Sequence, residues 1–150
     1  TEGIDSPAQA SQSATPVPGQ SRLYYNILVA EDNEVNAKLA RVVLEREGHT
    51  VTLVGSGPGV LTKLCKNHYD LILMDIEMPE IDGLEATRRI RAGECGENKA
   101  AIPIVAMTAH ALAYVKEQAE TVGMNDYITK PVDINKLKQT IAQIMSEARE

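Results

Sequence analysis

Short apolar segments alternate with amphipathic segments along most of this chain, and this order restricts the fold more than any other feature. The apolar segments expected to be strands are 25–30, 50–54, 70–75, 102–108 and 126–130. Between them, apolar residues recur every three or four positions, as at Val115, Ala119 and Val122, which predicts helices. Apolar strands that alternate with helices predict a five-stranded parallel sheet with helices on both faces, and therefore an α/β domain.

The expected helices lie at 35–47, 60–64, 84–92, 112–122 and 134–144. Glycine follows the first and the fourth, at Gly48 and Gly123, and glycine ends helices well because it adopts a left-handed conformation without strain. The apolar stripes of the last two helices are expected to face the core. Residues 56–59, Ser-Gly-Pro-Gly, are expected to form a loop before a short second helix, and Asp133 is expected to cap the last helix.

The chain divides into a polar N-terminal segment and one folded domain. Residues 1–21 are rich in Ser, Pro, Gln, Ala and Gly, so burial there cannot offset the entropy lost on ordering. We interpret them as a disordered linker, or as a remnant of how the domain was cut from a longer chain. Residues 22–150 are expected to form the domain. Its core must be mainly aliphatic, because the chain has no Trp or Phe and only five Tyr.

Composition and charge argue against several classes of function. The formal net charge is −6, which disfavours binding to nucleic acid. No apolar stretch approaches the ~18 residues needed to span a bilayer, and the N-terminus lacks the layout of a signal peptide. Cys65 and Cys95 show no CxxC spacing, and we expect two ordinary thiols in a reduced, cytosolic setting.

Charged and hydroxyl side chains follow the expected strands at the point where each strand ends. They are Glu31 and Asp32, Asp75, Thr108 and Lys130. Because the carboxyl ends of parallel strands meet at one edge of a sheet, these groups are expected to converge. Close carboxylates repel one another unless a cation lies between them, and a hard divalent ion such as Mg²⁺ prefers oxygen ligands. With a lysine and a hydroxyl added, this set predicts a site that binds a phosphoryl group while a carboxylate attacks it.

Four motifs occur in order at these strand ends: ILVAEDNEVN, DLILMDIEMPEIDG, IPIVAMTA and DYITKP. With them, residues 24–146 resemble the receiver domain of two-component response regulators, a flavodoxin-like (βα)5 fold that accepts phosphate from a histidine kinase. The resemblance implies that Asp75 is the phosphoacceptor and that Thr108 and Lys130 bind the phosphoryl group. It also implies a Mg²⁺ or Mn²⁺ ion, held by Glu31, Asp32, Asp75 and the backbone carbonyl of Glu77.

The same resemblance implies a switch and a partner. Tyr127 would change rotamer together with Thr108 on phosphorylation, and so alter the surface formed by the fourth helix, the fifth strand and the fifth helix. The donor would be a phosphohistidine on a histidine kinase or a histidine phosphotransfer domain. No direct contact with nucleic acid or membrane is implied, and the domain would be cytoplasmic even where the parent kinase is anchored in a membrane. The family usually has a cis peptide bond at the position of Lys130-Pro131.

Several alternatives remain open for the whole protein. The motifs EDNEVN and DIEMPEIDG resemble those of receivers in hybrid sensor histidine kinases, which favours a C-terminal receiver of such a kinase. A standalone receiver, or one whose effector domain has been removed, is the alternative. An aspartate-nucleophile phosphatase is disfavoured because the chain lacks the Asp-x-Asp-x-Thr/Val motif of that class. A phosphate-independent interaction module is disfavoured because all five site residues are present.

As a receiver, the domain would catalyse phosphotransfer to its own Asp75 and the later loss of that phosphate.

Overall fold

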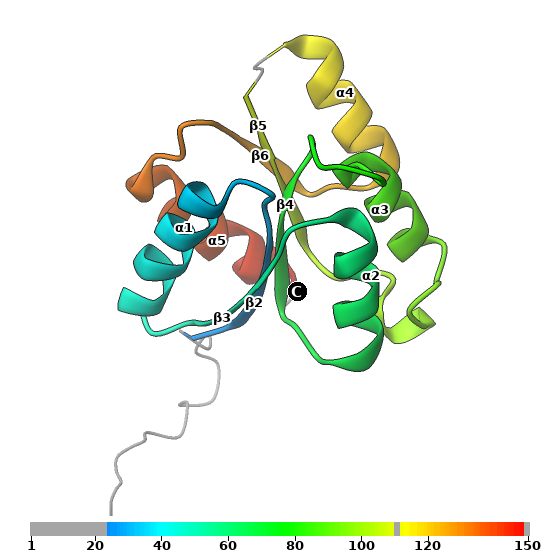
Figure 1. Ribbon diagram of the computed structural model, residues 1–150, viewed down its shortest axis with the longest axis horizontal. Coiled ribbons are helices and arrows are strands. Elements are labelled where there is room, and N and C mark those ends of the chain that lie inside the picture. The colour runs from blue at the N-terminus through cyan, green and yellow to red at the C-terminus, as the bar shows by residue number, and fades with distance from the viewer. Residues whose placement is uncertain (1–23, 110–111, 149–150) are drawn as a thin grey trace, which may run out of the picture.

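The computed structural model describes residues 24–109 and 112–148, in which strands and helices alternate along the chain (Figure 1). The strands are β2 (Asn26–Ala30), β3 (Thr50–Val54), β4 (Leu71–Asp75), β5 (Ile104–Thr108) and β6 (Asp126–Thr129). The helices are α1 (Glu34–Arg46), α2 (Gly57–Lys66), α3 (Gly83–Arg91), α4 (Ala113–Val122) and α5 (Ile134–Ala148), with a 3₁₀ turn η1 (Glu97–Lys99) before β5. The interpretation of residues 1–21 as a linker falls outside the described residues and stays a prediction.

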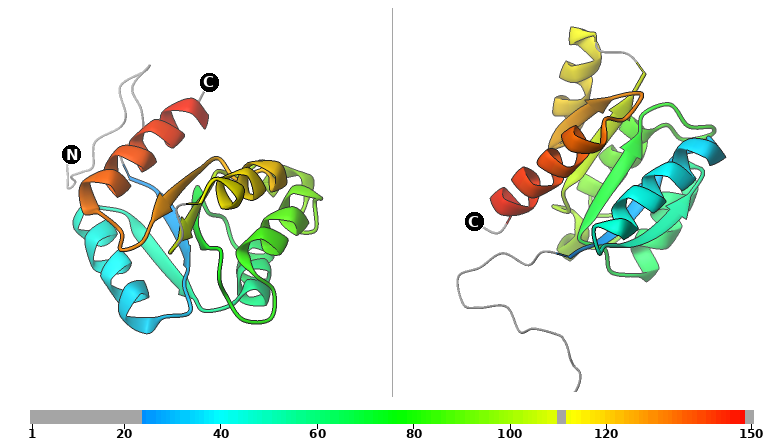
Figure 2. Two further views of the ribbon diagram at one scale, coloured as in Figure 1. Left: turned by 90° about the horizontal axis from the view of Figure 1, so that it is seen from above. Right: turned by 90° about the vertical axis from the view of Figure 1, so that its left-hand side faces the viewer.

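The five strands form one parallel sheet in the order β3-β2-β4-β5-β6. Helices α1 and α5 cover one face, and α2, α3 and α4 cover the other, as Figures 1 and 2 show from three directions. The predicted α/β fold, with a five-stranded parallel sheet between two layers of helices, is therefore confirmed. Because β4 lies in the middle of the sheet, its two faces are both covered.

This central position of β4 explains its composition. Successive residues of a strand point to opposite faces, so Leu71 and Leu73 pack in the α1 and α5 layer, whereas Ile72 and Met74 pack in the layer of α2, α3 and α4. All four side chains are fully buried. A strand in this place tolerates no polar side chain until it reaches the edge of the sheet, and Asp75 is the residue at that edge.

The second helix begins earlier than the sequence analysis predicted. Residues 57–59, which we expected in a loop, form the first turn of α2. Ser56 caps this turn, since its hydroxyl oxygen accepts a hydrogen bond of 3.1 Å from the Gly59 amide. Proline fits the first turn of a helix, where its missing N–H leaves no bond unmade. The expectation of a loop was therefore wrong: the glycines and the proline indicated a helix start.

The expected apolar stripes of the last two helices are only partly buried. Ala119 of α4 and Leu137 and Ile141 of α5 lie in the core as predicted. The first residue of each stripe, Leu112 and Ile134, is about half-exposed. Both stand at the start of a helix, beside the carboxyl edge of the sheet, where Figure 1 shows α4 reaching past the strands. Helical spacing alone does not reveal where the sheet beneath a helix ends.

The two cysteines do not remain free thiols. Cys65 of α2 and Cys95, in the connection between α3 and β5, are joined by a disulfide, with their Cα atoms 4.5 Å apart. The expectation of two ordinary thiols was wrong because it rested on sequence spacing. The bridge spans 30 positions and depends on the packing of the last turn of α2 against the segment that follows α3.

Candidate functional site

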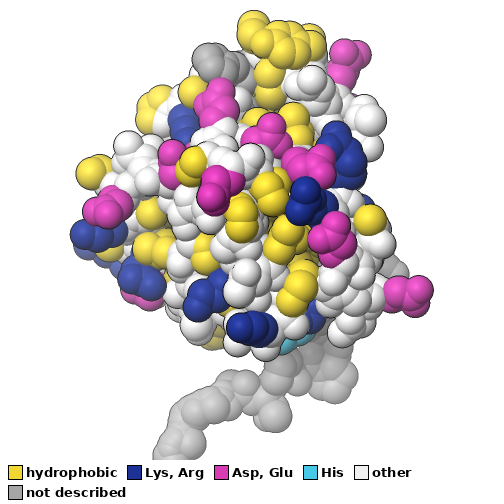
Figure 3. Space-filling view, turned by 45° about the vertical axis from the view of Figure 1, so that its right-hand side comes forward, with side chains coloured by type: hydrophobic (Ala, Val, Ile, Leu, Met, Phe, Trp, Pro, Cys, Tyr) yellow, Lys and Arg dark blue, Asp and Glu magenta, His cyan; other side chains and the backbone are white. Residues whose placement is uncertain are grey.

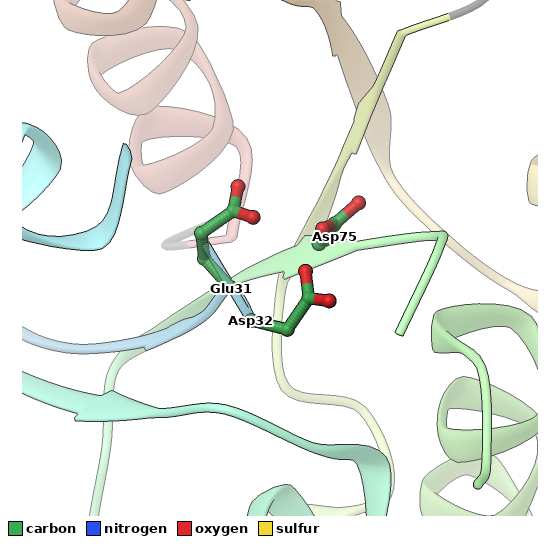
Figure 4. A group of neighbouring side chains, drawn as sticks. All are labelled: Glu31, Asp32 and Asp75. Atoms are coloured by element: carbon green, nitrogen blue, oxygen red, sulfur yellow. The ribbon is translucent and has the colours of Figure 1, made fainter. Parts of the chain in front are cut away.

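Three carboxylates meet at the carboxyl edge of the sheet. Glu31 and Asp32 follow β2, and Asp75 is the last residue of β4, the neighbour of β2 in the sheet. Figure 4 shows the three side chains turned toward one another. One oxygen from each lies within 4.8 Å of the others. The convergence predicted from the strand ends is therefore present.

Lys130 lies between two of these carboxylates. Its Nζ is 2.9 Å from Glu31 Oε1 and 3.0 Å from Asp75 Oδ2. Asp75 is 1% exposed and Glu31 is 5% exposed, so both charges are removed from water. Burying an unpaired carboxylate is costly, and a shared ammonium group lowers that cost. Lys130 thus makes the close approach of Glu31 and Asp75 possible.

Backbone amides fix the remaining oxygens of the same two carboxylates. Asp75 Oδ1 accepts a hydrogen bond of 3.0 Å from the amide of Glu77. Glu31 Oε2 accepts one of 3.1 Å from the amide of Asn33, the residue that also caps α1. Each carboxylate is therefore oriented from two sides, by Lys130 and by the chain two residues further on.

Burial sets the proton affinity of this cluster. Burial raises the pKa of Asp75 to about 6. The hydrogen bonds that Asp75 accepts from Lys130 and from the Glu77 amide oppose this rise, whereas the nearby Glu31 carboxylate adds to it. Burial also lowers the pKa of Lys130, but its bonds and charge attraction to Glu31 and Asp75 outweigh this, so that the Lys130 pKa lies above its ordinary value. Near neutral pH the site holds an ammonium group and a carboxyl group that is close to titrating.

The donor set fits a hard divalent cation. Three carboxylates and one ammonium group leave an excess of negative charge when all are ionised. Carboxylate oxygens are the ligands that Mg²⁺ and Mn²⁺ prefer. Asp32 is exposed and Asp75 is adjacent to it, so a bound ion would remain open to solvent on one side. Glu77 is exposed, and its amide contacts Asp75.

The other two predicted site residues lie on the neighbouring strands. Thr108 ends β5, is buried, and accepts a hydrogen bond of 2.7 Å at its backbone carbonyl from the Lys130 amide. Tyr127 lies on β6 opposite Ala106, and the Nζ of Lys116 stands 5.6 Å from the centre of its ring. The peptide bond between Lys130 and Pro131 is cis, as is usual in the family that the sequence resembles.

The role of Gly83 was not predicted from the sequence. A Cβ atom at this position would lie 2.4 Å from the backbone carbonyl oxygen of Asp75, and the Gly83 amide donates a hydrogen bond of 2.9 Å to the Ile76 carbonyl. Only glycine allows α3 to start this close to the end of β4. Asp82 caps α3, because its side chain accepts a hydrogen bond from the Glu85 amide. The close approach to Asp75 has no signature in the sequence.

A protein-family model described as the response regulator receiver domain matches residues 27–142 of this chain. The chain belongs to this family. Receiver domains take part in two-component signalling, so membership of this family supports the receiver interpretation over the phosphatase alternative considered above. In the part of the chain that the structure describes, no helix combines the length and the apolar character needed to cross a membrane.

Curated relatives of this receiver are found in two kinds of protein. The sensor protein GacS of Pseudomonas syringae pv. syringae is 40% identical over 115 residues, which make up 77% of this chain and 13% of that protein. Histidine kinase 5 of Arabidopsis thaliana is 36% identical and is matched over 79% of this chain and 15% of its own length. The polar-differentiation response regulator DivK of Brucella ovis is 35% identical, over 82% of this chain and 98% of its length. The chain thus spans a small part of the kinases and nearly all of DivK.

Solved structures agree with this assignment. The receiver domain of a sensor histidine kinase from Pseudomonas aeruginosa is 38% identical, with a TM-score of 0.74 over 81% of this chain and 98% of that one. That structure carries a magnesium ion coordinated in its active site cleft. The receiver domain of a Francisella response regulator is 25% identical, with a TM-score of 0.75 over 83% of this chain and 98% of that one.

The raised pKa of Asp75 predicts that Asp75→Asn stabilises the metal-free receiver at pH 7. The native state holds the Asp75 proton up to about pH 6, whereas the ordinary value of 3.8 applies to the unfolded chain, so the free energy of unfolding falls as the pH rises through this window. Asparagine carries no charge and avoids this loss, which amounts to about 2–3 kcal/mol at pH 7.

Urea denaturation in EDTA, followed by circular dichroism, measures this difference between the two proteins. At pH 3.5 both side chains are neutral and the difference should nearly vanish, which makes that measurement the control. An equal or lower stability of Asp75→Asn at pH 7 would contradict the electrostatic description of the site.

Proposed function

We propose that this receiver accepts a phosphoryl group on Asp75 from a phosphohistidine of a histidine kinase or a histidine phosphotransfer domain. The observation that supports the proposal best is the environment of Asp75. It is the one carboxylate of the cluster that combines a place at the end of the central strand, contact with Lys130 and adjacency to an exposed acidic ligand, Asp32. An attacking carboxylate with Lys130 on one side and a bound metal ion on the other would be suited to phosphoryl transfer.

In the proposed reaction, an oxygen of Asp75 forms a bond to phosphorus while the bond from phosphorus to the imidazole nitrogen of the donor breaks. The electron pair of that bond stays on the imidazole, which takes up a proton. Lys130 faces the reacting oxygens and, as an ammonium group, would pair with the oxygens of the transferred group. Thr108, on the next strand end, would donate a hydrogen bond from its hydroxyl.

A Mg²⁺ or Mn²⁺ ion bound here would neutralise charge that develops on the phosphoryl oxygens. We propose Asp32, Asp75 and the Glu77 backbone carbonyl as its direct protein ligands. Glu31 already has both oxygens engaged, with Lys130 and with the Asn33 amide. Its part would be to add negative charge and to orient Lys130, with any contact to the ion running through water.

Phosphoryl uptake provides the first test. Incubation with acetyl phosphate and Mg²⁺ should add one phosphoryl group to the wild-type chain and none to Asp75→Asn, as read by intact mass. Asp32→Asn should need a much higher Mg²⁺ concentration for the same uptake, because it loses a charged ligand. Glu80→Gln, which alters an exposed acid in the loop that follows Asp75, is the control and should behave as wild type. Equal uptake by wild type and Asp75→Asn would overturn the proposal.

An exposed apolar patch on α1 and α5 suggests where the donor binds. Val35 is 75% exposed and Leu39 is 53% exposed, and Val42 and Ile134 extend the same surface. Leu39 also lines a cavity of about 90 Å³ between α1 and α5, whose wall includes Glu31 and Lys130. The patch therefore adjoins the carboxylate cluster. A protein donor has to cover this rim in order to bring a histidine to Asp75, so the patch is placed to contribute to its binding.

The position of this patch predicts that a change there slows phosphoryl transfer from a protein donor but not from a small donor. Leu39→Gln removes apolar contact area but keeps a good helix former, and it should slow phosphoryl transfer from a phosphorylated histidine phosphotransfer domain about tenfold. Uptake from acetyl phosphate should stay unchanged, since a small donor does not touch the patch, and this serves as the matched control. A rate from the protein donor within a factor of two of wild type would exclude the patch as a docking surface.

We also propose that Thr108 and Tyr127 transmit phosphorylation to the surface of α4, β6 and α5. Figure 3 shows hydrophobic side chains gathered at the free end of α4, where Leu112 and Tyr114 are exposed. Tyr127 is partly buried and packs against the same layer as α4, and Lys116 of α4 lies over its ring. A turn of Tyr127 would break this contact, and buried aromatic rings move between discrete rotamers.

Beryllofluoride with Mg²⁺, a mimic of the phosphoryl group, tests the switch. It should shift the amide NMR signals of α4 and Tyr127 more than those of α1. Thr108→Ala should still bind the mimic but shift α4 less. Shifts that stay confined to the residues around Asp75 would show that Tyr127 is not part of a switch here.

The parent protein is proposed to be a hybrid sensor histidine kinase that carries this receiver in the cytoplasm. High identity to segments of sensor kinases supports this, while the match to nearly the whole of DivK supports a standalone receiver as the alternative. The sequence of the full-length gene product distinguishes them, since a kinase core would be encoded beside the receiver.

A further inference from the structure

The disulfide between Cys65 and Cys95 lies far from the carboxylate cluster. Cys65 is in the last turn of α2, just before β4 begins at Leu71, and Cys95 lies in the connection that leads into β5. Asp75 lies at the other end of β4. In Figure 1 the C-terminal ends of α2 and α3 lie at the lower side of the molecule, at the amino edge of the sheet. The phosphoacceptor role proposed for the opposite edge makes no use of this bond.

A second contact holds the same two segments together. The Nζ of Lys99, in η1, donates to the backbone carbonyls of Leu64 and Asn67, the latter at 2.9 Å. These carbonyls lie at the C-terminal end of α2, where a helix has no further amides to bond, so the ammonium group caps the helix. We call the Cys65–Cys95 bond and these Lys99 contacts together the α2 clasp.

We propose that Cys65 and Cys95 form a reversible thiol–disulfide site, oxidised by small-molecule disulfides and reduced by thiols, which sets how firmly the end of α2 is held. Three features of the clasp support reversibility. Cys65 is exposed, so a thiolate can reach its sulfur. The Cys95 Sγ lies 3.3 Å from the Leu61 carbonyl oxygen, where a thiol would donate a hydrogen bond. Lys99 contacts the end of α2 independently of the disulfide, so it would keep the two segments adjacent when the bond is open.

The chemistry balances with glutathione disulfide as the oxidant. A thiolate of one cysteine attacks a sulfur of glutathione disulfide, which forms a mixed disulfide and releases one glutathione thiolate. The second cysteine, as thiolate, attacks the protein sulfur of that mixed disulfide. The Cys65–Cys95 bond forms, a second glutathione thiolate leaves, and the two protons lost by the cysteines end on the two glutathione molecules. Reduction runs through the same steps in reverse.

The oxidised and the reduced protein should differ in how often the C-terminal end of α2 opens locally. With the bond formed, this end is held by a covalent link and by Lys99. With the bond open, Lys99 alone holds it, so local opening of the last turn should become more frequent. The effect of losing Lys99 should therefore depend on the redox state, which a purely structural bridge that never opens would not allow.

Two measurements on the whole chain test the proposal. Alkylation of free thiols, read by intact mass in native buffer, should show two free cysteines in reduced glutathione and none in glutathione disulfide, with full return on reversal. Hydrogen exchange at residues 63–67 and 97–100 should be about tenfold faster in the reduced protein. The double variant Cys65→Ser with Cys95→Ser should exchange like reduced wild type in both buffers.

Lys99→Met provides the sharper comparison. It should speed exchange in the last turn of α2 strongly in the reduced protein and only slightly in the oxidised one. Three results would each overturn the proposal: cysteines that stay alkylatable in glutathione disulfide, a bond that reduced glutathione cannot open without denaturant, or equal exchange in the two redox states. Disulfide-linked dimers in place of the internal bond, seen on a non-reducing gel, would also overturn it.

Discussion

The bridge that Lys130 forms between Glu31 and Asp75 is the interaction on which the rest of the site depends. Two carboxylates less than 10% exposed would repel each other and lose hydration, and one ammonium group at 2.9 and 3.0 Å offsets both effects. The strand order β2-β4-β5-β6 makes this geometry possible, because the carboxyl ends of these four strands lie side by side in the sheet. The pairing of Lys130 with Glu31 and Asp75 therefore depends on the order of the strands in the sheet.

The fold and the meeting of charged side chains at one edge of the sheet follow from short-range patterns, which explains why both could be predicted from the sequence. Burial on both faces requires β4 to be apolar up to its last residue, and the acid at that last position, Asp75, marks the edge of the sheet. Parallel topology then brings the residue after each strand to one edge, so that Glu31, Asp75 and Lys130 were predicted to meet from the positions of the strands alone.

The features that sequence analysis missed all depend on contacts between distant segments. Gly83 must be glycine because of a carbonyl eight positions earlier, and the partner of Cys65 is 30 positions away. The exposed ends of the last two stripes depend on where the sheet stops beneath them. The early start of α2 is different, because the signal was local: Ser56 as a cap and proline in the first turn are both typical of a helix start.

The two edges of the sheet differ in the charges and contacts that they hold. At the carboxyl edge, burial raises the pKa of Asp75 to about 6, so that ionisation of this group near neutral pH costs stability. At the amino edge, a disulfide and a lysine hold α2 to the segment after α3. A cation would be favoured at the first edge because it would offset this unfavourable negative charge, and such a differential affinity is what any ligand needs in order to shift a population. The α2 clasp lies at the opposite end of β4 from Asp75, so a change in the clasp can alter how firmly α2 is held without touching the carboxylate cluster.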